Sequence, residues 1–188
     1  MSFRIEKLQK EHKVEKFDCG ARDQNRYLQE FAWQNMQLGY GVTYVAVENV
    51  AVEESPGDVA SGDGTSGSVA GFYSLAAGHV EFENLPEDFR DTEGLPRYPA
   101  PTVLLGQLGV DLSAQGKGLG KALLAHAIEK AVQVSEVVGA AAIEVHAATE
   151  QAREFYRRYG FVQMQDSPDH LFLSMEVGRS LTEGPPSR

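Results

Sequence analysis

The chain has 188 residues, and 42% of them are hydrophobic, which is enough for the core of one compact domain. Its single cysteine, Cys19, excludes an internal disulfide framework, and no apolar run reaches the length of a membrane span. The first residues do not have the pattern of a secretory signal. We therefore expect a cytoplasmic protein.

The net charge of −10 is concentrated in one part of the chain. Eleven acidic residues and a single basic one, Arg90, lie between Glu48 and Glu93, whereas the rest of the chain has 16 basic and 16 acidic residues. We expect one flank of the molecule to repel phosphate while the neutral remainder can still bind it. The charge therefore does not exclude a nucleic-acid partner.

The first half of the chain predicts three strands and one helix. Residues 3–8 alternate in the manner of a strand, 23–38 place apolar side chains at helical spacing up to Gly39, and 42–47 are β-branched and aromatic. Residues 55–68 are rich in Gly, Ser and Asp, and a strand pattern begins again at 69–75. We interpret about 53–68 as a flexible acidic insertion within one domain.

The second half predicts a strand at 103–110, an apolar-faced helix at 121–134 and a strand at 141–146, after an irregular, proline-rich segment over 81–101. Thr149 can cap a helix that runs to Tyr159 and closes at Gly160, and a final strand is expected at 171–175. The predicted domain spans 1–178, followed by a polar, disordered tail at 179–188. No metal-ligand cluster is expected.

A glycine-rich loop, Gln115-Gly116-Lys117-Gly118-Leu119-Gly120, joins the strand that ends near Val110 to the next helix. Glycines at every second position let a ligand approach the backbone, and the N–H groups of a helix amino end attract anions. The loop matches neither the P-loop nor the Rossmann fingerprint. It predicts either a pyrophosphate cradle or a tight strand-to-helix turn.

Two motifs together resemble the GNAT family of acetyl-CoA-dependent N-acyltransferases. One is the loop pattern of Gln115, Gly118 and Gly120, and the other is the Phe155-Tyr156 pair closed by Tyr159-Gly160-Phe161. The resemblance implies an α/β (α+β) fold with a mixed, mostly antiparallel sheet of six to seven strands and about four helices, splayed between the fourth and fifth strands. It also implies an enzyme that uses acetyl-CoA and no metal.

The same resemblance suggests which residues hold the cofactor. Backbone N–H groups of the loop would bind the pyrophosphate, and the backbone of Leu108 and Val110 would bind the pantetheine arm. Lys117 and Lys121 either add positive charge there or are ordinary solvated side chains. The predicted cofactor residues are Leu108, Val110, Gln115, Gly116, Lys117, Gly118, Leu119, Gly120 and Lys121.

Further segments resemble the GNAT-type toxins of bacterial toxin–antitoxin pairs. They are Phe17-Asp18-Cys19-Gly20, Tyr27-Leu28, Gly71-Phe72-Tyr73-Ser74-Leu75 and Pro96-Arg97-Tyr98-Pro99-Ala100-Pro101. This likeness implies acetylation of the α-amino group of an aminoacyl-tRNA, an antitoxin with a ribbon-helix-helix head, and a homodimer. Scattered arginines are candidates for RNA phosphates: Arg22, Arg26, Arg97, Arg153 and Arg157.

The chemistry of acetyl transfer indicates what the site must supply. An aminoacyl α-amine titrates near pH ~8, so a strong general base is not required, although Glu144 or His146 can be considered for that role. The departing thiolate benefits from a proton donor, and a tyrosine stays protonated at neutral pH. The family resemblance assigns this donor to Tyr156, whose alternative role is packing on the sheet.

Two segments depart from the toxin pattern. Toxins of this group usually have Arg-Leu-Ala-Val-Asp before the loop, whereas this chain has Gln107-Leu108-Gly109-Val110-Asp111, and the arginine expected before the last strand is His170. These changes leave three hypotheses open. The chain acetylates aminoacyl-tRNA, or it acetylates a small amine or protein N-terminus, or it is a non-catalytic acyl-CoA-binding module.

Overall fold

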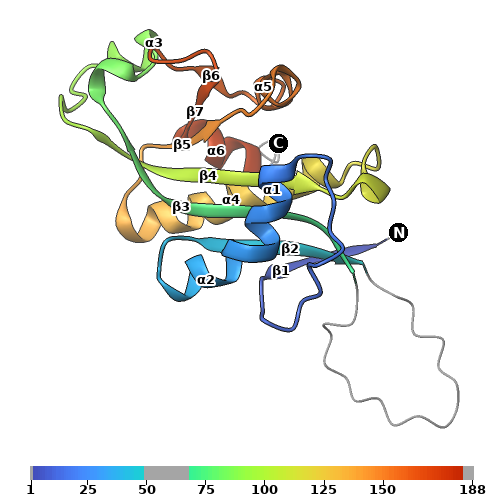
Figure 1. Ribbon diagram of the computed structural model, residues 1–188. Helices are drawn as coiled ribbons and strands as arrows, with labels where there is room; N and C mark the ends of the chain where they lie inside the picture. Colours follow the sequence, from blue (N-terminus) through green and yellow to red (C-terminus); the bar gives the residue numbers. More distant parts are fainter. Residues whose placement is uncertain (1, 49–67, 184–188) are drawn as a thin grey trace, which may run out of the picture. The chain divides into compact units, whose positions relative to one another are not determined.

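The computed structural model describes residues 2–48 and 68–183 (Figure 1). Seven strands form one sheet in the order β1-β2-β3-β4-β5-β7-β6, and β4 pairs with β5 in parallel. The strands are β1 (Phe3–Lys7), β2 (Val42–Glu48), β3 (Val69–Val80), β4 (Ala100–Val110), β5 (Ala142–His146), β6 (Val162–Gln163) and β7 (His170–Ser174). The expected mixed sheet is thus confirmed, with β6 as a strand that the sequence did not indicate.

The helices are α1 (Arg22–Arg26), α2 (Ala32–Gln37), α3 (Glu87–Arg90), α4 (Leu119–Val138), α5 (Glu150–Arg157) and α6 (Met175–Glu183). The structure extends the strand predicted at 69–75 to Val80 and the helix predicted at 121–134 to 119–138. Within the described part of the chain, no helix is both long and apolar enough to cross a bilayer. Nearly all of the predicted acidic insertion at 53–68 lies outside the described residues.

The chain forms two compact units, one of residues 1–74 with 107–124 and one of residues 75–106 with 125–188. Each unit is discontinuous in sequence because β3, β4 and α4 run through both. The prediction of a single domain over 1–178 stays a prediction.

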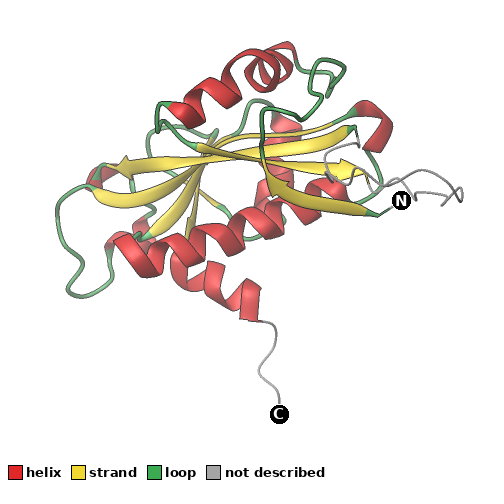
Figure 2. Cartoon of the chain, turned by 90° about the horizontal axis from the view of Figure 1, so that it is seen from below, coloured by secondary structure: helices red, strands yellow, loops and turns green. Residues whose placement is uncertain are grey.

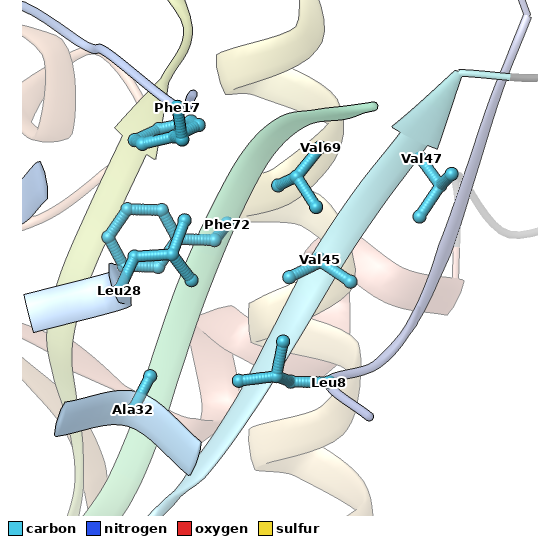
Figure 3. Close-up of a cluster of buried hydrophobic side chains, with 8 residues drawn as sticks. All are labelled: Leu8, Phe17, Leu28, Ala32, Val45, Val47, Val69 and Phe72. Carbon is cyan, nitrogen blue, oxygen red and sulfur yellow. The ribbon is translucent and has the colours of Figure 1, made fainter. Parts of the chain in front are cut away.

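One hydrophobic cluster of the first unit packs side chains of β2 and β3, together with Leu8 and Phe17, against the helical segment from Arg22 to Gln37 (Figure 3). A π-helical turn at Tyr27–Phe31 joins α1 to α2, so the predicted helix at 23–38 is present with one widened turn. Leu28 and Ala32 are buried at a spacing of four residues, and the ring of Phe72 contacts Phe17 with centroids 5.3 Å apart. This packing fixes the segment that leads into the loop 17–20.

Helix α4 begins against β3 in the first unit, and Figure 2 shows it as a long helix beside the strands. A Cβ at Gly71 would lie 2.8 Å from Cδ1 of Leu123 and 3.3 Å from Cδ2 of Leu119. Glycine at this position therefore lets the first turn of α4 approach the strand closely. That approach anchors the amino end of α4, where the glycine-rich loop enters it.

The second unit is built on the parallel pairing of β4 with β5 and the antiparallel pairing of β5 with β7. The β4–β5 register runs from Thr102↔Ala142 to Leu105↔Val145, although β4 itself continues to Val110. The remaining residues of β4 have no β5 partner in this register. The splaying of the fourth and fifth strands that the family resemblance implies stays a prediction.

The C-terminal segment differs from the prediction of a disordered tail from 179 onward. Helix α6 continues to Glu183 and buries Met175 and Gly178, while residues 184–188 lie outside the described part. Gly178 lies where a Cβ would be 3.5 Å from Val132 and 3.7 Å from Ile128, both on α4. The sequence of this helix shows no apolar face of large side chains, because a small residue, Gly178, forms its contact with α4.

Candidate active site

The side chain of Asp111 stabilises the loop after β4 by hydrogen bonds. Its Oδ1 accepts hydrogen bonds from the backbone N–H of Ser113 at 2.9 Å and from the hydroxyl of Ser113 at 2.6 Å. Its Oδ2 accepts from the N–H of Asp18 at 3.0 Å. Partial burial raises the pKa of Asp111, but these hydrogen bonds to the carboxylate outweigh it and leave the pKa below its ordinary value. The carboxylate thus ties the loop 17–20 to the start of the glycine-rich loop.

Gln115 strengthens the same connection. Its Nε2 donates to the carbonyl of Cys19 at 3.2 Å and to the carbonyl of Val110 at 3.0 Å. The side chain is therefore engaged within the protein, so a contact from Gln115 to a cofactor would come from its backbone. This explains physically why an amide at this position suits the loop.

The middle of the loop adopts a backbone conformation that requires glycine. Gly116 and Gly118 have φ of +73° and +81°, and a Cβ at either position would meet no atom within 4 Å. In the described residues, the N–H groups of Gly118, Leu119, Gly120 and Lys121 have no backbone acceptor. These groups form the open amino end of the 20-residue helix α4, where an anion is favoured.

The surroundings of the loop combine apolar and basic groups. A hollow of about 530 Å³ lies next to it in the first unit, lined by Phe3, Ile5, Lys117, Gly118, Leu119 and Ala122. Lys117 donates from Nζ to the carbonyl of Ser113 at 2.8 Å, which brings its charge back toward the loop. The side chain of Lys121 is exposed. Both lysines stay candidates for contacts with an anion.

The far end of β4 offers backbone groups to a ligand. The N–H of Asp111 donates to the carbonyl of Ala70 on β3 at 2.9 Å. Backbone groups alternate between the two sides of a strand, so those of Val110 and Leu108 face away from β3. The carbonyl of Val110 accepts from Gln115, which leaves its N–H and the groups of Leu108 for the predicted contact.

Tyr156 lies on α5 in the second unit. Thr149 caps this helix as predicted, because its Oγ1 accepts from the N–H of Ala152 at 3.1 Å. The Tyr156 ring contacts Phe155 and Phe161, with centroids 5.3 and 5.4 Å away, and only 6% of the residue is exposed. Burial raises the pKa of Tyr156 well above its ordinary value, so the phenol holds its proton. Its hydroxyl has no hydrogen-bond partner in the described chain.

The turn after α5 explains the second sequence motif. Gly160 has φ of +89°, and its N–H donates to the carbonyl of Arg157 at 3.1 Å. The N–H of Phe161 donates to the carbonyl of Tyr156 at 3.3 Å, which folds the Phe161 ring onto that of Tyr156. The sequence Tyr159-Gly160-Phe161 therefore serves to hold Tyr156 in place.

The arginines predicted to hold RNA differ in their availability. Arg153 pairs with Asp169 at 2.8 Å, and Arg157 pairs with Glu154 at 3.1 Å. Arg26 pairs with Glu30 at 2.9 Å and lies over the ring of Phe31. Arg22 and Arg97 are exposed, with no side-chain partner among the described residues. The structure thus ties three of the five into local ion pairs.

A buried polar cluster in the second unit was only partly recognised in the sequence. Glu144 and His146 share a face of β5 as expected, but Glu144 is buried, accepts a hydrogen bond from the hydroxyl of Thr102 and contacts Nε2 of His170 at 2.9 Å. Burial raises the pKa of Glu144, and the bonds from His170 and Thr102 outweigh this and lower it. Burial also lowers the pKa of His146. The alternation Glu-x-His on a strand was the available signal.

Comparison with known proteins identifies the family. The sequence profile described as an acetyltransferase (GNAT) domain matches residues 59–163. The chain belongs to the GNAT acetyltransferase family. A curated relative, the tRNA-acetylating toxin of Mycobacterium tuberculosis (strain ATCC 25618 / H37Rv), is 42% identical over 115 residues, which cover 61% of this chain and 68% of the toxin.

Solved structures of AtaT and KacT have a similar fold. The structure of AtaT complexed with acetyl-methionyl-tRNAfMet has a TM-score of 0.79 and 26% identity, and the match covers 93% of this chain and 96% of AtaT. A crystal structure of a tyrosine-to-phenylalanine mutant of KacT has a TM-score of 0.80 and 26% identity, covering 95% of this chain and 98% of KacT. The likeness extends over nearly the whole GNAT fold.

Proposed function

We propose that this GNAT chain transfers the acetyl group of acetyl-CoA to the α-amino group of an amino acid carried on tRNA, and so acts as a translation-blocking toxin. The observation that carries the proposal is the open amino end of α4, where the N–H groups of Gly118, Leu119, Gly120 and Lys121 have no backbone acceptor in the described residues. Such a site suits the pyrophosphate of a coenzyme. AtaT has been solved with acetyl-CoA, which supports the same donor here.

The residues around the loop fit this cofactor. The left-handed Gly116 and Gly118 let phosphate oxygens approach the backbone, and a Cβ would narrow that approach. Backbone groups of Leu108 and Val110 would hold the pantetheine arm along the edge of β4 that faces away from β3. Acetyl-CoA supplies an activated thioester, and the protein's part is to hold it and to manage a proton.

Tyr156 has the properties of the proton donor. Burial raises its pKa, so the phenol is protonated throughout the neutral range. As the C–N bond forms and the C–S bond breaks, it would pass its proton to the departing sulfur and regain one from the attacking amine. The rings of Phe155 and Phe161 fix its orientation without using its hydroxyl. The acceptor amine of an aminoacyl ester titrates near pH ~8, so a useful fraction is already a neutral nucleophile.

The choice of acceptor rests on the relatives. The Mycobacterium tuberculosis protein is named a tRNA-acetylating toxin, and AtaT was solved with an acetylated methionyl-tRNA. The exposed Arg22 and Arg97 are the predicted arginines best placed to meet RNA phosphates, because local ion pairs do not occupy them. AtaT also forms a complex with the antitoxin AtaR, and we propose an antitoxin partner for this chain as well.

The test is an acetyl-transfer assay with competing acceptors. Purified protein is incubated with radiolabelled acetyl-CoA and either charged tRNAs, deacylated tRNAs or free amines, with Tyr156→Phe as the control. We expect label on charged tRNA only, and loss of that label in the variant. Label on free amines or protein N-termini alone would contradict the tRNA acceptor, and binding of acetyl-CoA without transfer to any acceptor would contradict catalysis.

A further inference from the structure

Three side chains that can bind a metal ion lie together on β5 and β7, within the second unit. Glu144 and His146 are two residues apart on β5, and His170 on β7 is the antiparallel partner of His146. One ligand atom from each of the three lies within 4.8 Å of the other two. Both strands are regular elements of the sheet, which fixes the backbone from which these side chains project.

Residues outside this cluster orient His170 and Glu144 through hydrogen bonds, as residues around a metal site orient its ligands. Nδ1 of His170 lies 2.8 Å from Oδ2 of Asp166, so its Nε2 is directed toward Glu144. The hydroxyl of Thr102 donates to Oε1 of Glu144, which leaves Oε2 toward His170. A carboxylate on the outer nitrogen of a histidine is the usual second contact of a metal-bound imidazole.

The glycine at position 78 makes room for this arrangement. A Cβ there would lie 2.7 Å from Oγ1 of Thr102 and would collide with the carboxylate of Glu144. A side chain larger than hydrogen would therefore displace the two groups whose hydrogen bond holds Oε1. The position of the Glu144 carboxylate is set by β3, β4 and β7 together.

Carboxylates contact both ring nitrogens of His170. Each of its two ring nitrogens lies within 2.9 Å of a carboxylate oxygen, one from Asp166 and one from Glu144. A neutral imidazole has one N–H, so one nitrogen would present its lone pair to a carboxylate. A metal ion bound by Nε2 of His170 and Oε2 of Glu144 would occupy that lone pair, and it can also recruit His146.

We propose that Glu144, His146 and His170 bind one divalent transition-metal ion of the Zn²⁺ type. Two imidazoles and one carboxylate favour zinc, cobalt or nickel over magnesium and calcium, which prefer oxygen ligands. The inference is independent of the acetyl-transfer proposal, and it departs from the sequence-based expectation that the chain has no metal site.

The site closes by a movement of His146. Ligand atoms around tetrahedral zinc lie about 3.3 Å apart, given zinc–nitrogen distances of about 2.0 Å. Nε2 of His170 and Oε2 of Glu144 are 2.9 Å apart and would separate slightly on an ion, whereas the ring of His146 is stacked on that of His170 with centroids 4.0 Å apart. His146 is exposed, so its ring can rotate toward the ion, and the open side leaves the fourth position to water.

The test is zinc binding by the untagged full-length chain after treatment with a chelator. Isothermal titration calorimetry should show one Zn²⁺ per chain, and Co²⁺ should give the visible absorption bands of a four- or five-coordinate ion. His146→Gln, at an exposed position, should fold normally and weaken Zn²⁺ binding by about tenfold or more. Asp166→Asn, which changes the carboxylate that contacts Nδ1 of His170, should weaken Zn²⁺ binding to a similar extent. His79→Gln, at an exposed histidine on β3, is the matched control and should leave the affinity unchanged.

Each other outcome would overturn the proposal. Absence of stoichiometric binding would show that these three side chains do not form a metal site. Binding that survives in His146→Gln, or that falls equally in His79→Gln, would place the ion elsewhere. Circular dichroism of the metal-free variants verifies that the fold is retained.

Discussion

Two helix ends of this GNAT chain are built in opposite ways. At the amino end of α4, Gly118, Leu119, Gly120 and Lys121 keep N–H groups without backbone acceptors in the described residues. At the carboxyl end of α5, the turn through Gly160 satisfies the carbonyls of Arg157 and Tyr156. The first end is open to a ligand, and the second is closed on itself.

The comparison shows how a helix end can serve either binding or positioning. An open amino end offers several aligned donors to an anion without a charged side chain. The carboxyl end of α5 uses the carbonyls of Tyr156 and Arg157 within the protein, and its turn fixes the side chains beside it, here the tilted rings of Tyr156 and Phe161. We therefore expect changes at the loop to affect cofactor affinity and changes at Tyr156 to affect the chemical step.

The largest effect is expected for Tyr156→Phe. This change keeps the buried ring and removes the proton donor, so kcat for acetyl transfer should fall by about 10²- to 10⁴-fold while the Kd for acetyl-CoA stays within about twofold. Because burial raises the pKa of Tyr156, the wild type should show no alkaline loss of activity from this group below its ordinary pKa near ~10. Steady-state kinetics from pH 6 to 9 would measure the fall in kcat in the variant and the pH dependence of kcat in the wild type.

Tyr159→Phe is the matched control for that variant. Tyr159 lies one turn further along, and its ring contacts Phe155 at 5.1 Å between centroids. We expect nearly unchanged kcat. An equal fall in both variants would show that loss of a hydroxyl anywhere in this aromatic cluster disturbs the enzyme, which would refute a specific role for Tyr156.

The next effect is expected for Gly118→Ala. A Cβ at φ of +81° costs roughly 1–2 kcal/mol of backbone strain, and it also intrudes on the proposed phosphate site. The Kd for acetyl-CoA should rise about tenfold. Gly39→Ala is the matched control, because Gly39 has φ of +75° and open space around it. This variant should lose similar stability and keep the wild-type affinity for acetyl-CoA. Thermal unfolding and calorimetric titration separate the two effects.

A smaller effect is expected for Gln115→Ala, which removes two hydrogen bonds to the carbonyls of Cys19 and Val110. Each such bond contributes about 1 kcal/mol, and a loosened loop should raise the Kd for acetyl-CoA about threefold. Gln29→Ala removes a similar hydrogen bond, from Nε2 of Gln29 to the carbonyl of Phe17 at 2.9 Å. If Gln29→Ala weakened binding as much, the effect would be one of general stability.

The smallest effect is expected for Lys121→Ala. An exposed, solvent-screened charge contributes at the low end of about 0.2–1 kcal/mol toward an anion, so the Kd should rise less than about twofold at low salt. High salt should abolish the difference because it screens exposed charges. Lys130→Ala, further along α4, should change nothing at either salt concentration.

The sequence predicted those parts of the site that depend on local backbone rules. Glycines at 116, 118 and 160 take positive φ values that few other residues adopt, and the Thr149 cap and the Tyr-Gly-Phe turn are equally local. The engagement of Gln115 was not predictable, because its acceptor Cys19 lies 96 residues away. The Glu144–His170 contact likewise depends on the β5–β7 register and on the turn that carries Asp166.

Two features of the fold were missed for a related reason. The sequence of helix α6 is mostly polar because the helix buries few residues. Its contact with α4 depends on the absence of a Cβ at Gly178. The stability of this segment comes from packing partners far away in the sequence. The short strand β6 is recognisable only through its pairing with β7.

The most direct test of the account is single-turnover acetyl transfer to charged tRNA, measured over a range of acetyl-CoA concentrations for the wild type, Tyr156→Phe and Gly118→Ala. We predict that Gly118→Ala reaches the wild-type maximum rate at a higher acetyl-CoA concentration, whereas Tyr156→Phe saturates at the wild-type concentration with a rate lowered about 10²-fold or more. If Gly118→Ala lowered only the maximum rate, or Tyr156→Phe raised only the half-saturating concentration, the division between an open binding end and a closed catalytic end would be wrong.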